Sequence, residues 1–362
     1  MHVGIVGAGQ LGRMLALAGY PIGVRCLFLD RSSDTPGAQV APSLIGDLED
    51  AAQLAELARR SDVVTFDWEN ISGSALKPLE KITQVRPPRA ALEVSQDRLE
   101  EKALFARLKI PVAQHAPIDN REQLIRAAET IGLPGVLKTR RLGYDGKGQF
   151  ELRAVSDVDR AWAALGGAGL IYEKFQNFSR EVSLLSVRSA GGQTAFYPLS
   201  ANTHGGGILR YSVAPFANAT LERAARLYSK RVMAALDYVG VLAIEFFVVG
   251  DRLVANEMAP RVHNSGHWTI EGCVTSQFEN HLRAICGMPL GSTRALGATA
   301  MINFLGLMPP RERLLEVEDL AYHDYGKTPR PGRKLGHCTI LKRLPKERDK
   351  ALISTLKLIE WA

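Results

Sequence analysis

A glycine-rich turn between a strand and a helix lies near the start of the chain. Of all features of the sequence, it most strongly limits which folds the chain can adopt. Residues 3–7 are strand-forming, the segment Gly7–Gly12 fits the pattern G-x-G-x-x-G, and an apolar-periodic helix follows. Residues 25–30 are the next expected strand, which ends in Asp30, where a dinucleotide-binding motif has its ribose-binding acid. The pattern predicts a βαβ unit at the start of an α/β domain.

This turn indicates a phosphate site more safely than it indicates one cofactor. Glycines let the backbone approach an anion, and the N-terminus of a helix offers N–H groups to any phosphate. NAD binding is one interpretation, and a tight turn without a ligand is another. Gln10 and Arg13 could hold a ribose phosphate or be solvated.

Composition places the chain among globular proteins. Its 362 residues are 46% apolar and 23% charged, which excludes disordered, collagen-like and coiled-coil classes and predicts two or three domains. The net charge of +7 favours anionic ligands, and the absence of a Lys/Arg tract favours small phosphorylated ligands over nucleic acid. Four dispersed cysteines and an N-terminus without a signal or membrane segment predict a cytoplasmic protein with free thiols that associates with no membrane.

The pattern of elements changes along the chain. After an α/β domain of about 90 residues, we expect a charged helix over 95–108, alternating antiparallel strands from residue 180, and a helix over 219–236. Residues 241–258 are expected to form a hairpin. The remaining strands and a terminal helix are assigned to a small third domain.

A second glycine-rich segment, Gly143–Gln149, follows a strand that contains Lys138. Such a loop can fold its N–H groups over a triphosphate while its lysine, Lys147, neutralises charge. The segment is no Walker A loop, because G-x-x-x-x-G-K-[ST] is absent. A plain hairpin tip is the alternative, since Asp145-Gly146 is a strong turn signal.

The expected hairpin carries an acid on each strand. If residues 250–252 form a three-residue loop, Glu245 lies directly opposite Glu257. Facing carboxylates inside an apolar hairpin destabilise each other, and a divalent cation removes the conflict. With the oxygen of Asn256 and with phosphates, the pair suits Mg²⁺. Solvated acids on an exposed hairpin face are the alternative.

Together these features resemble the ATP-grasp ligases, and in detail the N5-carboxyaminoimidazole ribonucleotide synthetases of purine biosynthesis. The resemblance extends over nearly the whole chain in the family's order. Its most specific strings are Gly143–Gln149, Asn177–Ser183, Ala259–Thr269 and Arg330–Lys334. It implies a mixed α/β and α+β fold with a Rossmann-like domain over 1–92, a two-subdomain ATP-grasp domain over 93–290 (glycine-loop subdomain about 110–175) and a small β-rich domain over 291–362.

The resemblance also implies a reaction, in which ATP and bicarbonate form carboxyphosphate and 5-aminoimidazole ribonucleotide (AIR) is carboxylated on its amine. Mg²⁺ is implied at Glu245 and Glu257, and a homodimer is implied. The ATP-binding residues would be Arg98, Lys138, Gly143, Tyr144, Gly146, Gly148, Gln149, Glu173, Lys174, Phe175, Gln176, Glu181, His204, Asn256 and Glu257.

AIR would be bound by Gln10, Leu11, Glu69, Tyr144, Asp145, Arg333 and Lys334, and the catalytic residues would be Asp145, Lys147, Arg261, His263, Asn264 and Lys334. Asp145 is the base candidate for the amine. His263 and His267 are spaced H-x-x-x-H, but the glutamate of H-E-x-x-H is missing, which argues against zinc. The family commonly has a small residue where this chain has Leu142, a departure that affects the closing conformation of the loop.

Three other functions are alternatives to this one. A formate-dependent glycinamide ribonucleotide transformylase shares the architecture and the acid hairpin, but Asn264–Thr269 and Arg330–Lys334 argue against it. A silent nucleotide sensor would not need the acids and Lys138. An NAD-dependent oxidoreductase leaves the central 150 residues unexplained.

Overall fold

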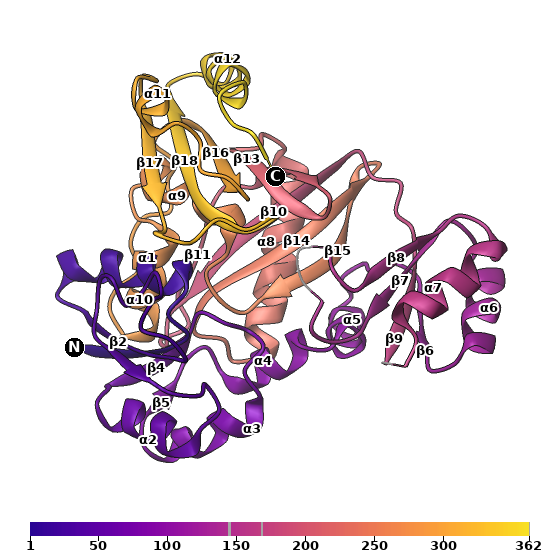
Figure 1. The fold of residues 1–362 in the computed structure, drawn as a ribbon, viewed down its shortest axis with the longest axis horizontal. Coiled ribbons are helices and arrows are strands. Elements are labelled where there is room, and N and C mark those ends of the chain that lie inside the picture. Colours follow the sequence, from indigo (N-terminus) through magenta and orange to yellow (C-terminus); the bar gives the residue numbers. More distant parts are fainter. Residues whose placement is uncertain (144–145, 168, 362) are drawn as a thin grey trace.

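A computed structural model describes residues 1–143, 146–167 and 169–361 (Figure 1). The N-terminal part is a parallel sheet of order β3-β2-β1-β4-β5, so the predicted βαβ unit is confirmed. Its alternation of buried strands and amphipathic helices is the pattern that favours such a sheet. The strands are β1 (His2–Val6), β2 (Arg25–Asp30), β3 (Ser43–Ile45), β4 (Val63–Phe66) and β5 (Gln84–Val85), and the helices are α1 (Gln10–Gly19), α2 (Ala51–Arg59) and α3 (Gly73–Leu76).

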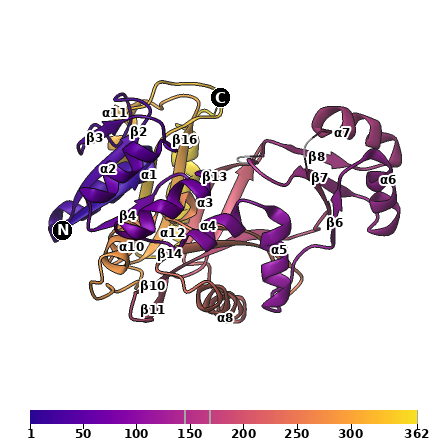
Figure 2. The ribbon, with the colours of Figure 1, turned by 90° about the horizontal axis from the view of Figure 1, so that it is seen from below.

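Two helices lead out of this part, and a small α+β subdomain follows them. Helix α4 (Arg89–Ser95) precedes α5 (Arg98–Arg107), whose N-cap Asp97 accepts a hydrogen bond from Leu99 N. The subdomain has its own apolar core and projects to one side of the molecule (Figure 2). Its antiparallel sheet β6-β9-β7-β8 comprises β6 (His115–Ile118), β7 (Gly135–Thr139), β8 (Gln149–Leu152) and β9 (Leu170–Lys174), beside α6 (Arg121–Thr130) and α7 (Val158–Leu165).

The largest sheet of the described part is antiparallel and includes the C-terminal strands. Its order is β15-β14-β10-β12-β13-β16-β18-β17, with β11 on β10. Strand β16 bonds directly to β13, so strands from both sides of the expected boundary at residue 290 belong to one continuous sheet. The strands are β10 (Arg180–Arg188), β11 (Thr194–Phe196), β12 (Ser200–Gly205), β13 (Ile208–Ala214), β14 (Gly240–Val249), β15 (Arg252–Ala259), β16 (Ala298–Leu305), β17 (Leu320–Asp324) and β18 (Lys334–Lys342).

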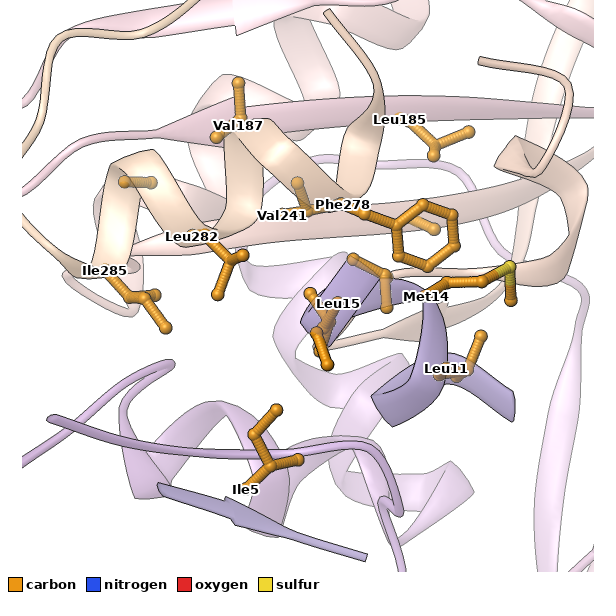
Figure 3. Close-up of a cluster of buried hydrophobic side chains, with 14 of the residues drawn as sticks. Ile5, Leu11, Met14, Leu15, Leu185, Val187, Val241, Phe278, Leu282 and Ile285 are labelled. Atoms are coloured by element: carbon orange, nitrogen blue, oxygen red, sulfur yellow. The ribbon is translucent and has the colours of Figure 1, made fainter. Parts of the chain in front are cut away.

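Helices cover both faces of the central strands. Helix α8 (Ala219–Ala235) packs on β10, β14 and β15, and α10 (Gln277–Ile285) packs on the opposite side together with α1. Figure 3 shows Leu11, Met14 and Leu15 of α1 facing Phe278 and Leu282 of α10. This shared core fixes the N-terminal domain against the central sheet. The remaining α-helices of the described residues are α9 (Thr269–Gly272), α11 (Arg311–Leu315) and α12 (Pro345–Leu356).

Two negative expectations concern membranes and disulfides. Within the three described ranges, every helix is too short or too polar to span a bilayer. All four cysteines are free thiols, and Cys26, Cys273 and Cys338 are buried.

Candidate active site

The acid pair lies where the sequence placed it, on hairpin β14–β15. Glu245 pairs with Glu257 in the ladder. The loop is shorter than expected, because Val249 pairs with Arg252 across a two-residue turn. A β-bulge between Glu245 and Phe246 then adds the missing residue on β15 and restores the predicted register. The extra residue is Asn256, which therefore lies beside Glu257.

The two carboxylates differ in their electrostatic surroundings. Burial raises the pKa of Glu245 to about 7, with Glu257 as the second cause. Burial would also raise the pKa of Glu257, but Arg98 and Lys138 outweigh it and hold that pKa below its ordinary value. The Arg98 Nη1 to Glu257 Oε2 distance is 3.0 Å. Since each additional negative charge is costly here, the pair favours a cation between its oxygens.

A second cluster of charges, from the small subdomain and from helix α5, faces the pair. Glu173 is only 4% exposed, and its Oε2 lies 3.1 Å from Lys138 Nζ and 3.3 Å from Lys102 Nζ. Burial opposes its ionisation, yet the two lysines lower the pKa of Glu173 to about 2. Burial lowers the pKa of Lys138. The side chain of Glu173 therefore positions cations, and Lys102 is a member that sequence reasoning missed.

A cavity of about 520 Å³ lies between the subdomain and the hairpin. Phe178 and Phe247, whose rings stack at 4.6 Å, line it with apolar surface. His204 Nδ1 lies 3.1 Å from Glu181 Oε1, and although burial opposes it, this carboxylate raises the pKa of His204. Of the predicted ATP residues, those that line the cavity are Arg98, Lys138, Gly146, Gln149, Glu173, Lys174, Phe175, Gln176, Glu181, His204, Asn256 and Glu257. Lys147 of the catalytic set lines it too.

Gly146 and Lys147 of the glycine-rich segment, which precede β8, line this cavity. A Cβ on Gly146 would lie 2.9 Å from Gly206 O, so the loop touches the turn between β12 and β13. Leu142 has φ 61°, in the left-handed region, and is 71% exposed. Because side chains with a Cβ are strained in this region, a small residue suits this position. Gly143 lines a second cavity, and Gly148 lines neither. Tyr144 and Asp145 lie outside the described residues.

That second cavity, of about 450 Å³, opens between the N-terminal domain and the acid pair. Arg261 forms a salt bridge with Glu69 at its wall. Lys327 Nζ donates to Gln10 Oε1 at 3.0 Å. Burial, with the charges of Arg333 and Lys334 nearby, lowers the pKa of Lys327 to about 8. Sequence reasoning missed Lys327, although it follows a glycine shortly before the basic string. The predicted AIR residues in the wall are Gln10, Leu11, Glu69, Arg333 and Lys334.

The two cavities share six lining residues, Arg98, Glu245, Glu257, His263, Asn264 and Lys334. His263 Nδ1 lies 2.9 Å from Ser265 Oγ, and burial, with Arg261 and Lys334, holds its pKa well below the ordinary value. Asn264 exchanges two hydrogen bonds with Asn303. His267 Nδ1 is 3.0 Å from Asn264 Nδ2 and 3.2 Å from Tyr325 Oη, so it orients Asn264. These shared residues form a junction between the two cavities. A ligand bound in one cavity would contact a ligand bound in the other at this junction.

The N-terminal glycine loop differs from the sequence expectation of an open phosphate site. Gly9 N and Gly12 N donate to Asp67 Oδ2, and Ala8 N donates to Asp30 Oδ2. The predicted ribose acid is thus a partner of the loop itself. Asp67 follows strand β4, and nothing in the sequence pattern pointed to it.

Family models match three successive parts of the chain. A ribonucleotide synthetase preATP-grasp domain matches residues 1–96, an ATP-grasp domain 103–278, and a phosphoribosylaminoimidazole carboxylase C-terminal domain 299–351.

Relatives match over nearly the full length. The N5-carboxyaminoimidazole ribonucleotide synthase of Pseudomonas aeruginosa is 49% identical over 94% of each chain. The crystal structure of the corresponding synthetase from Thermus thermophilus superposes with a TM-score of 0.95 at 49% identity over 99% of each chain. That from Aspergillus clavatus, in complex with ADP and 5-aminoimidazole ribonucleotide, has a TM-score of 0.93 at 28% identity, over 99% of this chain and 98% of its own. The chain therefore belongs to the N5-carboxyaminoimidazole ribonucleotide synthase family and is an ATP-grasp ligase.

Proposed function

We propose that this protein uses ATP and bicarbonate to carboxylate AIR, giving N5-carboxyaminoimidazole ribonucleotide in purine biosynthesis. The observation that carries the proposal is the junction of the two cavities at Glu245, Glu257, His263, Asn264 and Lys334. A reactive intermediate formed from ATP in one cavity would reach an amine held in the other without crossing bulk water.

Mg²⁺ fits the hairpin. Two carboxylates face each other in one ladder, and the Oδ1 of Asn256 is buried without a hydrogen-bond partner among the described residues. Oxygen donors of this kind suit a hard divalent cation that keeps positions for phosphate oxygens. When bound, the ion would neutralise charge on the transferring phosphoryl group.

The cationic side chains have separate tasks in this proposal. Lys138, held by Glu173, would bind phosphate oxygens of ATP, and Arg98 would link those phosphates to Glu257. Phe178 and Phe247 offer an apolar face for the base. On the other side, Lys327 and Arg333 would hold the phosphate of AIR.

The chemistry balances without another reagent. A bicarbonate oxygen attacks the γ-phosphorus, the bond to ADP breaks, and carboxyphosphate results. Its collapse yields CO₂ and phosphate, and the AIR amine forms the new C–N bond while it loses a proton. Asp145 is the proposed base, with Lys147 or Lys334 to hold it. Arg261 and His263 would line the bicarbonate pocket.

Assembly and location belong to the same proposal. We expect a homodimer, as the family resemblance implies, and a cytoplasmic location, which the free thiols of all four cysteines support.

An ADP-release assay tests the reaction. We expect release to need AIR, bicarbonate and Mg²⁺, each omitted in turn, and product to form in step with ADP. Stimulation by formate with glycinamide ribonucleotide instead would overturn the assignment in favour of the transformylase reaction.

A further inference from the structure

The inner N–H groups of the N-terminal glycine loop already have anionic partners. Gly9 N donates to Asp67 Oδ2 at 2.7 Å and Gly12 N donates to the same oxygen at 3.1 Å. Ala8 N donates to Asp30 Oδ2 at 2.7 Å. Groups of this kind receive the pyrophosphate in a dinucleotide-binding loop.

The glycine spacing of the loop is explained by the same carboxylate. A Cβ on Gly7 would lie 1.9 Å from Asp67 Oδ1, and one on Gly9 would lie 3.0 Å from Oδ2. A Cβ on Gly12 would lie 3.1 Å from that oxygen and 2.8 Å from Phe28 Cε1. The three glycines therefore make room for an aspartate of the chain where a dinucleotide-binding loop makes room for phosphate.

Electrostatics agree with this role. Asp67 is 8% exposed and faces the N-terminus of α1, where the helix dipole favours a negative charge. Cations lie farther out, since Lys327 Nζ bonds to Gln10 Oε1 and Arg333 lines the same cavity. A phosphate dianion would be repelled from the inner loop and attracted to this outer rim.

We propose that Asp67, assisted by Asp30, is a built-in anion that fills the glycine loop, excludes dinucleotides, and keeps the substrate phosphate at Gln10 and Lys327. Asp67 is thus a specificity-determining and positioning residue that takes no part in the chemical steps. The part of the inference that concerns AIR rests on the proposed function, and the part that concerns the loop does not.

Amide NMR spectra with inorganic phosphate as the probe test the loop. In D67A the Gly9 and Gly12 N–H groups are free, so their resonances should move with a Kd at least roughly tenfold below that of wild type. D67N keeps an oxygen on both N–H groups, so their resonances should move less with phosphate than those of D67A. If D67A does not fold, D67S replaces it, with the same expectation. Absence of any phosphate-dependent shift at Gly9 and Gly12 in the folded variant would overturn the inference.

A double-mutant cycle tests the steric part. Gly9 has φ −73°, which alanine tolerates, and the nearest atom to its added Cβ is Asp67 Oδ2. G9A should therefore lower the melting temperature of wild type by more than it lowers that of D67A. Equal losses in both backgrounds would show that Asp67 does not fill the loop.

Steady-state kinetics test the substrate part. In D67A the AIR phosphate can move inward, so KM for AIR should rise several-fold and more ATP should be hydrolysed per product, while KM for ATP stays constant. A merely destabilised protein would lose kcat without this split. If wild type shows no AIR-dependent turnover, the proposed function fails while the phosphate titration still decides the role of Asp67.

Discussion

The molecule has two glycine-rich loops that look alike in sequence and differ in what their surroundings offer. In the loop at Gly7–Gly12, carboxylates of Asp67 and Asp30 accept the backbone N–H groups. The loop around Gly146 instead lies over a cavity with Lys138 and Arg98 in its wall. One loop is closed by the protein's own anions, and the other faces cations that a polyphosphate would need.

Glycines in a loop indicate that some group approaches the backbone closely, but they do not indicate which group it is. An acid from a distant strand can take the place of a ligand, as Asp67 does. The charge of the groups opposite the loop decides the matter, and these come from tertiary structure.

The largest expected effect is a loss of activity at the cavity beside the loop around Gly146. E257Q removes the carboxylate that faces Glu245 and bonds to Arg98. We expect ATP turnover to fall on the order of a thousandfold, because the charge that would hold the metal and position the phosphates is lost. ADP release measures this. D251N, a change in the turn of the same hairpin, is the control, and turnover of E257Q near wild type would remove the acid pair from the mechanism.

The next effect is a loss of stability at Glu173, which contacts Lys138 and Lys102. The pKa of Glu173, usually 4.5, is lowered to about 2, because Lys138 and Lys102 outweigh the effect of burial. Its contribution is present above pH 4.5 and is lost as the pH falls toward 2, which corresponds to about 3 kcal/mol. E173Q should lower the free energy of unfolding at pH 7 by about that amount, as chemical denaturation can measure.

The matched control is E151Q on β8 of the same sheet, where Arg153, the partner of Glu151, is exposed. It should change stability by less than about 0.5 kcal/mol. Equal effects of the two substitutions would contradict the role of Glu173 as a buried anchor.

At the Gly7–Gly12 loop, the dependence of stability on pH has the opposite sign. Burial raises the pKa of Asp67 from 3.8 to about 6; bonds from Gly12 and Gly9 and the charge of Arg261 oppose the rise, while Asp30 adds to it. The folded state therefore holds the proton more tightly, and stability present below pH 3.8 is lost as the pH rises through about 6. The loss is about 3 kcal/mol.

Unfolding free energies of wild type and D67N between these pH values check the prediction. Their difference should change with pH, because the amide of D67N does not titrate. A constant difference would show that the carboxylate of Asp67 keeps an ordinary pKa.

Much of this arrangement could be predicted from local sequence, because strands, helices and turns have local signals. The facing of Glu245 and Glu257 was predicted correctly, but through a loop one residue too long that a bulge at Asn256 compensates. A bulge has no clear sequence signal. Lys102 and Asp67 were missed because their partners, Glu173 and the glycine loop, lie far away along the chain. The pairing of β16 with β13 was invisible for the same reason.

The smallest expected effect is a change of stability at Leu142, next to the loop around Gly146. It distinguishes backbone strain at this position from side-chain contacts. Leu142 has φ 61°, a left-handed conformation that costs a leucine roughly 1 kcal/mol, and its exposed side chain has little burial to lose. L142N should stabilise the protein by up to about 1 kcal/mol, since asparagine tolerates this region. L142G should gain less, because glycine adds entropy to the unfolded chain. L142V should be the least stable, because its branched Cβ clashes most at positive φ. Thermal unfolding of the series measures the order, and a valine variant as stable as the asparagine one would show that contacts of Leu142, rather than its backbone, set the stability of the loop.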